Sequence, residues 1–143
     1  MRGREAFTLR MKADPQLNLY AGTSHALHLC VYQLSNPNPF NQFSMDMAGI
    51  SKLMNCERFD QGVALASRIV VQPGDNVNMP IDRAEGARYV GIVAGYYTLN
   101  NQSSVRLYQI PLIEEKRGAQ LVTRMAPLEI DLYLGPQAIQ SAR

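Results

Sequence analysis

The stretch LEIDLYL, residues 128–134, alternates strictly between apolar and polar side chains. Successive side chains of a β-strand point to opposite faces, so the pattern predicts a strand with one buried and one solvated face. The stretch FTLRMK, residues 7–12, repeats this alternation near the other end of the chain. A period of two at both ends favours a fold built from strands.

Four further stretches have strand patterns and are separated by turn residues. They are HALHLCVYQL (25–34), VALASRIVVQ (63–72), RYVGIVAGYY (88–97) and residues 105–113, and the last two are expected to pair as a hairpin. Pro73-Gly74 forms a turn between 63–72 and its expected short partner strand at 77–81. The charged run 114–118 is predicted to be a solvated loop, and the residues after Gly135-Pro136 a polar tail.

Residues 35–56 interrupt the strand pattern. Pro39 suits the first position of a helix, and apolar residues then follow at spacings of three and four. The spacing predicts one broken or two short amphipathic helices, whose apolar residues are Phe40, Phe43, Met47, Ile50 and Met54. We expect Met45, Met47 and Met54 to lie in the core rather than in a binding groove.

Together these patterns predict an all-β protein, a two-sheet β-sandwich with a short helical insertion between its second and third strands. A chain of 143 residues is long enough for one hydrophobic core and too short for two. We therefore expect a single domain over residues 1–143, with its core at 7–134 and the helical insertion at 35–56.

Composition narrows the class of function. Fourteen basic and twelve acidic residues leave a net charge of +2, which gives no electrostatic reason to expect a nucleic-acid partner. No stretch reaches the ~18 consecutive apolar residues of a membrane span. The basic start is followed by Glu5 and Ala6 instead of an apolar segment, so no signal peptide is expected. Two interpretations stay open, a cytosolic protein and a secreted domain separated from its leader.

The reactive side chains form no recognisable catalytic or metal-binding set. His25 and His28 are three residues apart on a predicted strand, so their side chains should point to opposite faces. Cys30 lies among apolar neighbours, where a cysteine usually behaves as a small buried hydrophobe. We therefore expect no enzyme activity, no cofactor and no metal.

The connection DPQLNLYAGTS, residues 14–24, carries apolar side chains where a solvated loop would be polar. Two interpretations stay open. The segment continues a strand or folds over the end of the sandwich, or it is an apolar recognition loop held by a rigid scaffold. In the second case, replacing Leu17, Asn18 and Tyr20 by alanine would remove binding and leave the fold intact, with Leu17 and Tyr20 as the anchors.

The order of the segments resembles that of a known family. Leu17-Asn18, Val31-Tyr32-Gln33-Leu34, Phe40 and Phe43, Gln72-Pro73-Gly74 and Tyr89-Val90-Gly91-Ile92-Val93-Ala94 follow one another across residues 7–134. In this order and spacing the chain resembles the type VI secretion outer-membrane lipoproteins of the TssJ (SciN-like) family.

The resemblance implies a transthyretin-like β-sandwich in the periplasm, tethered to the inner leaflet of the outer membrane by a lipidated N-terminal cysteine. No cysteine lies near the start of this chain, so that anchor is absent from it. The implied function is assembly of a type VI secretion system, and the implied partner is the periplasmic C-terminal domain of the inner-membrane protein TssM. The loop between the first two strands would hold it, through Asp14, Pro15, Gln16, Leu17, Asn18, Leu19, Tyr20 and Gly22.

The implied compartment also bears on the cysteines. An oxidising periplasm permits a disulfide, so we predict that Cys30 and Cys56 are bonded and fasten the helical insertion to the second strand; two separate buried thiols are the alternative. The alternative function is a carbohydrate- or small-ligand-binding β-sandwich module. A sugar site needs exposed aromatic residues, whereas this chain has no tryptophan and its tyrosines lie mostly in strand patterns.

Overall fold

Strand β1 (Ala6–Ala13) lies between two partners in the first of two sheets. The computed structural model describes residues 6–142, and in it β1 pairs antiparallel with β4 (Asn76–Asp82) and parallel with β9 (Leu128–Leu134). Strand β10 (Ile139–Ala142) pairs with β9 at the edge, so the order is β10-β9-β1-β4. The strands predicted at 7–12 and 128–134 are confirmed, and they are direct neighbours.

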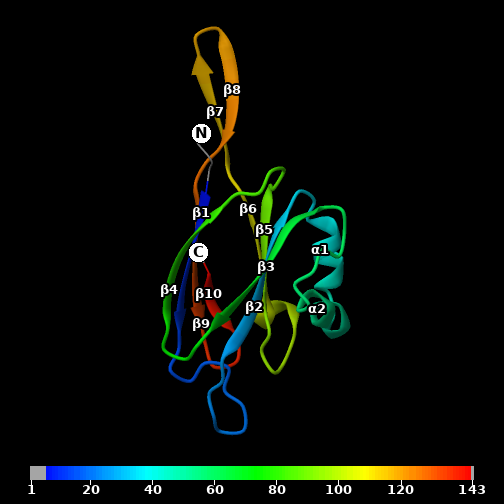
Figure 1. Cartoon of the computed structure of the whole chain (residues 1–143), viewed down its shortest axis with the longest axis vertical. Helices are drawn as coiled ribbons and strands as arrows, with labels where there is room; N and C mark the ends of the chain where they lie inside the picture. Colours follow the sequence, from blue (N-terminus) through cyan, green and yellow to red (C-terminus); the bar gives the residue numbers. More distant parts are fainter. Residues whose placement is uncertain (1–5, 143) are drawn as a thin grey trace.

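The second sheet is antiparallel throughout and has the order β3-β2-β5-β6. Its strands are β2 (Leu27–Leu34), β3 (Val63–Val71), β5 (Tyr89–Ala94) and β6 (Val105–Gln109). The apolar faces of the two sheets enclose the main core of the protein (Figure 1). The predicted all-β, two-sheet sandwich is therefore confirmed, as is the hairpin of β5 with β6.

Two predictions are wrong, one about the partner of residues 77–81 and one about the end of the chain. Residues 77–81 do not pair with β3 but form part of β4 in the other sheet, where Val77 lies opposite Met11 of β1. The predicted turn at Pro73-Gly74, where Gly74 has a φ of +82°, therefore carries the chain from one sheet to the other. The end of the chain is not a polar tail either, because Ile139 of β10 is buried in the main core.

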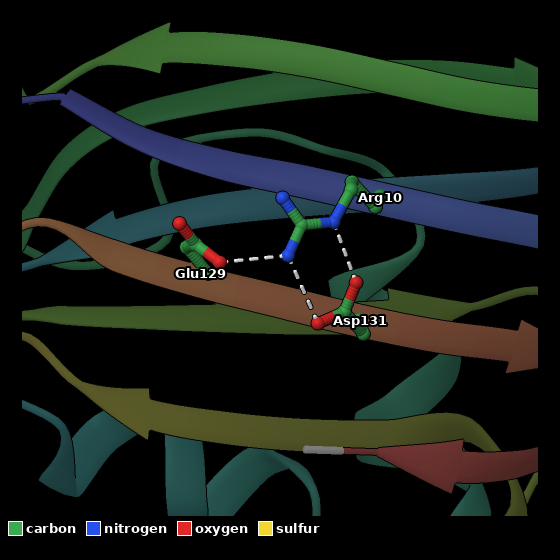
Figure 2. A network of polar contacts seen from close by, with 3 residues as sticks. All are labelled: Arg10, Glu129 and Asp131. Carbon is green, nitrogen blue, oxygen red and sulfur yellow. Dashed lines mark hydrogen bonds and ion pairs between the residues drawn. The ribbon is translucent and has the colours of Figure 1, made fainter.

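The solvated face of β1 carries an ion-pair network (Figure 2). Arg10 Nε donates to Asp131 Oδ1 at 2.7 Å, and Arg10 Nη2 donates to Asp131 Oδ2 at 3.1 Å and to Glu129 Oε1 at 2.8 Å. All three side chains are partly exposed, so water screens these pairs and each adds little stability. The network instead favours one register, since it joins one residue of β1 to two same-face residues of β9.

The helical insertion covers the outer face of the second sheet (Figure 1). It contains α1 (Asn38–Phe43) and α2 (Met47–Leu53), so the prediction of two short helices is confirmed. Phe40, Ile50 and Leu53 are buried against this face, and the Tyr32 hydroxyl of β2 donates to the carbonyl of Leu53. The insertion thus has a second, smaller core of its own.

Two features hold the insertion close to the sheet. A Cβ placed on Gly91 of β5 would lie 2.7 Å from the ring of Phe40, so only glycine permits this approach. Cys30 of β2 and Cys56 after α2 form a disulfide, with their Cα atoms 5.2 Å apart. The contact and the disulfide together join the insertion to the two middle strands of the sheet.

The expected burial of the methionines in this insertion is wrong for two of them. Met45 is 78% exposed and Met47 is 64% exposed. The reason is a break in helical phase between α1 and α2. The Asp46 carboxylate accepts a hydrogen bond from the Gly49 backbone N–H at 2.8 Å and so starts a new helix in a new direction.

Residues 112–125 form a separate hairpin that projects beyond the sandwich (Figure 1). It consists of β7 (Leu112–Arg117) and β8 (Gln120–Met125), so the predicted single strand at 105–113 and solvated loop at 114–118 are wrong. Charged residues fit this strand because Glu115 pairs across the hairpin with Arg124, at 3.2 Å. None of the helices within residues 6–142 is long and apolar enough to span a membrane.

Candidate partner-binding site

The 14–24 connection lies at the end of the sandwich opposite the β7–β8 hairpin (Figure 1). It begins with a turn stabilised by Asp14, whose carboxylate accepts hydrogen bonds from the Gln16 backbone N–H at 2.8 Å and the Tyr133 hydroxyl at 2.6 Å. The Tyr133 hydrogen bond, and then the Gln16 N–H, lower the pKa of Asp14 below its ordinary value. Asp14 therefore fixes the loop to β9, while Pro15 and Gln16 are exposed at the turn.

The next two residues of the loop belong to the interior. Leu17 is fully buried in the main core, and its carbonyl accepts a hydrogen bond from the His25 backbone N–H at 2.9 Å. Asn18 is buried with a positive φ of 50°, and its side-chain amide donates to the carbonyl of Ala26 at 3.1 Å. The expectation that Leu17 is an exposed anchor is therefore wrong. The loop folds over the end of the sandwich, as one of the two interpretations held.

Tyr20 is the exposed aromatic residue of the loop. Its backbone pairs with Thr23 around Ala21 and Gly22, whose φ values of +53° and +78° suit a type I′ turn. The Tyr20 ring stacks on Tyr97 with centroids 4.2 Å apart, yet these residues remain 55% and 53% exposed. His25 contacts the other tyrosine of this pair, Tyr97, edge to face at 5.2 Å.

A pocket of about 340 Å³ lies beside this aromatic pair. Three connections line it, namely residues 18–20, the segment that follows β5, and the turn between β9 and β10. The Leu19 backbone N–H donates to the carbonyl of Pro136 at 2.7 Å and so ties two of these connections together. Asn100, Ser103 and Gln137 supply polar groups to the lining, and Tyr96 beneath it is buried.

The structure brings together a different set of residues from the predicted one. Asn18, Leu19 and Tyr20 of the predicted loop line the pocket. Other lining residues, such as Tyr97 and Gln137, come from elsewhere in the chain and were not predicted. The pair Tyr96-Tyr97 at the end of a strand pattern was the available signal. The two residues follow the end of β5, and here Tyr96 is buried and Tyr97 exposed.

The histidines stay apart from any metal-binding arrangement in the described part of the chain. The prediction that His25 lies on a strand is wrong, because β2 begins at Leu27 and His25 lies in the loop, with Nδ1 3.3 Å from the carbonyl of Asn18. His28 is exposed on β2. Within residues 6–142 there is no group of three or more histidine, cysteine or acidic residues placed to hold a metal ion.

The family with the description "Type VI secretion lipoprotein, VasD, EvfM, TssJ, VC_A0113" matches residues 5–132. The chain belongs to this family. The resemblance drawn from the order of its segments is thereby confirmed. As a type VI secretion lipoprotein, the protein is a periplasmic subunit anchored at the outer membrane.

Solved structures agree with the family in fold. The type VI secretion lipoprotein TssJ1 from Pseudomonas aeruginosa is 21% identical with a TM-score of 0.72, over 99% of this chain and 98% of that chain. Serratia marcescens Lip, a membrane-bound component of the type VI secretion system, is 19% identical with a TM-score of 0.72, over 95% and 96%. A chain from a structure described as the TssM C-terminal domain from EAEC is 15% identical with a TM-score of 0.66, over 96% and 98%. No curated protein matches the chain.

Proposed function

We propose that this type VI secretion lipoprotein is an assembly subunit that docks the periplasmic C-terminal domain of TssM with the 14–24 end of its sandwich. Two of the structures that share its fold are described as a type VI membrane complex and as the TssM C-terminal domain, which supports this partner. The docking surface is centred on Tyr20 and Tyr97 and is bordered by Pro15, Gln16 and Gly22. Asp14, Leu17 and Asn18 position this surface from below.

The exposed tyrosine pair is the observation that carries the proposal. Aromatic side chains with large exposed area are typical anchors of protein interfaces, because they bury much apolar surface at a low cost in side-chain entropy. Stacking already orients the rings of Tyr20 and Tyr97, and the Leu19–Pro136 hydrogen bond holds the loops that carry them. A surface that is ordered before binding loses less conformational entropy when the partner arrives.

The pocket beside the tyrosines supports binding rather than catalysis. Its polar lining includes the amides of Asn18, Asn100 and Gln137 and the hydroxyl of Ser103. Such groups orient a ligand through hydrogen bonds and do not supply a general base at neutral pH. We infer that the pocket receives a side chain of the partner and that the protein is not an enzyme.

Calorimetry of single variants against the purified TssM periplasmic domain tests the proposal. We expect Tyr20→Ala and Tyr97→Ala each to weaken binding by about 2 kcal/mol, roughly thirtyfold, as is typical when an anchor residue is truncated. The matched control is Met45→Ala, since Met45 is also a large exposed apolar side chain but lies on the helical insertion. Unchanged affinity in both tyrosine variants, or an equal loss in the control, would place the interface elsewhere.

The alternative, a carbohydrate-binding module, has one observation in its favour. The same pocket combines tyrosine rings with amide groups, which are the two kinds of group that sugar sites use. It predicts that the protein binds oligosaccharides and that Tyr97→Ala removes this binding. Oligosaccharide binding together with normal TssM affinity in that variant would favour the alternative.

A further inference from the structure

The β7–β8 hairpin has two leucine side chains that the described chain leaves substantially exposed. It forms a two-stranded sheet of its own, apart from both sheets of the sandwich. Leu112 is 47% exposed and Leu121 is 65% exposed. An isolated two-stranded hairpin is only marginally stable in water, so exposed leucines on such an element indicate a surface that makes contact in the working assembly.

Charge is distributed unevenly along this hairpin. Lys116 and Arg117 adjoin the turn, whereas Glu114 and Glu115 lie nearer the sandwich. Glu115 is paired with Arg124 at 3.2 Å and with Arg117 at 3.3 Å, which lowers its pKa. The two cations nearest the turn are therefore Lys116 and Arg117, while the exposed Glu114 lies on the same face as Lys116 but nearer the sandwich.

Lys116 and Leu121 share one face of the tip, and Arg117 lies on the other face beside the turn. Lys116 lies directly opposite Leu121 in the hairpin register, and paired residues share a face of an antiparallel ladder. Among the residues that the structure describes, Lys116 has no ion-pair partner. A leucine beside an unpaired ammonium group suits an anionic surface with an apolar layer beneath it.

The direction of the chain indicates which surface this is. Strand β1 starts at the hairpin end of the sandwich and runs away from it towards the 14–24 loop (Figure 1). The described chain therefore begins at the hairpin end of the sandwich. In a lipoprotein the lipid is attached at the N-terminus, so the hairpin end is the end that faces the membrane.

We propose that the tip of the β7–β8 hairpin, through Lys116, Arg117 and Leu121, contacts the anionic headgroup region of the membrane that holds the protein. The contact is shallow, because both strands of the hairpin have open edges whose backbone groups need water or headgroups as partners. It orients the sandwich with the 14–24 loop directed away from the membrane. It does not depend on which partner that loop binds.

Sedimentation with vesicles tests the contact. The probes are vesicles of phosphatidylethanolamine and phosphatidylglycerol at a ratio of about 3:1, and vesicles of phosphatidylcholine alone as the neutral reference. We expect the chain to bind the anionic vesicles more strongly, and the double variant Lys116→Gln, Arg117→Gln to lose roughly 25-fold, since each cation near an anionic surface contributes about fivefold. Leu121→Ser should lose several-fold without any change of charge.

The control variant is Lys52→Gln with Arg58→Gln, which removes the same charge from an exposed position in the helical insertion and another just after it. We expect it to lose less than threefold in vesicle binding. Circular dichroism and an unchanged affinity for the TssM domain confirm that the hairpin variants are folded. Three results would each overturn the proposal: equal binding to neutral and anionic vesicles, equal loss in control and hairpin variants, or a concentration-dependent dimer of the chain that Leu121→Ser abolishes.

Discussion

Replacing Leu17 by alanine should separate the stability of the 14–24 loop from its binding. Leu17 is fully buried in the main core, so the change removes buried methyl groups and leaves a cavity. Such changes cost about 3 kcal/mol. In a chain of 143 residues, each kcal/mol lowers Tm by roughly 3 °C, so we expect a loss of roughly 10 °C.

Tyr20→Ala should behave in the opposite way. Its ring is 55% exposed and contributes to the fold chiefly through its stacking on Tyr97, a type of contact worth about 0.5–1.5 kcal/mol. We expect Tm to fall by no more than roughly 4 °C, while affinity for the TssM domain falls about thirtyfold. The triple alanine variant of Leu17, Asn18 and Tyr20 would lose both stability and affinity, so it could not separate the two effects.

Thermal melting by circular dichroism, together with calorimetry at a temperature where every variant is folded, measures both quantities. Leu65→Ala is the control for Leu17→Ala, because Leu65 lies on edge strand β3 and is 43% exposed. We expect this control to change Tm by only a few degrees. A Leu17→Ala variant that melts with the wild type would refute the assignment of this residue to the core.

Three other changes test separate parts of the fold. Replacing both cysteines by serine should cost about 3 kcal/mol in urea unfolding, and thiol titration of the denatured, unreduced wild type should find no free thiol. The pKa of Asp14 is lowered from its ordinary value of 3.8, so its carboxylate stabilises the fold at pH values above 3.8, and this stability is lost as the pH falls through the folded-state pKa. Tyr133→Phe should raise the pKa of Asp14, as measured by NMR titration, and an unchanged pKa would exclude the hydrogen bond. Gly91→Ala should destabilise the protein by about 1–3 kcal/mol by crowding Phe40, and adding Phe40→Leu should recover part of the loss; full stability of the single variant would contradict the close approach.

The strands could be predicted because their signal is local. Alternation in residues 7–12 and 128–134 depends only on neighbouring side chains, and both stretches are strands. Which strands pair is a different matter. The parallel contact of β1 with β9 joins residues about 120 positions apart, such as Arg10 and Asp131, and no local pattern specifies it.

The hairpin at 112–125 shows where local composition misleads. The run of charges at 114–117 resembles a solvated loop, but these side chains alternate across a ribbon that is exposed on both sides. The ion pair of Glu115 with Arg124 compensates charge within this strand pair. It could not be predicted without knowing which strand pairs with residues 112–117. The exposed Met45 and Met47 were misjudged for a similar reason, since one helical period was assumed across a break.

Only part of the candidate site could be predicted from the sequence. The apolar character of residues 14–24 correctly marked an unusual loop, and Tyr20 is its exposed aromatic residue. Composition could not distinguish the buried Leu17 from its neighbours, because burial there depends on the two sheets that close over the loop. Tyr97 and Gln137 reach the same end of the molecule from distant parts of the chain, so only the tertiary structure brings them together.

The course of β1 has a mechanical consequence. This strand starts at the hairpin end, which we propose faces the membrane, and leads straight into the loop that carries Tyr20, so in that arrangement it is the shortest covalent path between a lipid anchor and a docked partner. Its eight residues are already extended, at about 3.3 Å each, and have little length left to yield under tension. A pulling force between the two membranes would therefore travel along β1, while β4 and β9 clamp it on both sides. The protein would act as a short, stiff tie between the two membranes.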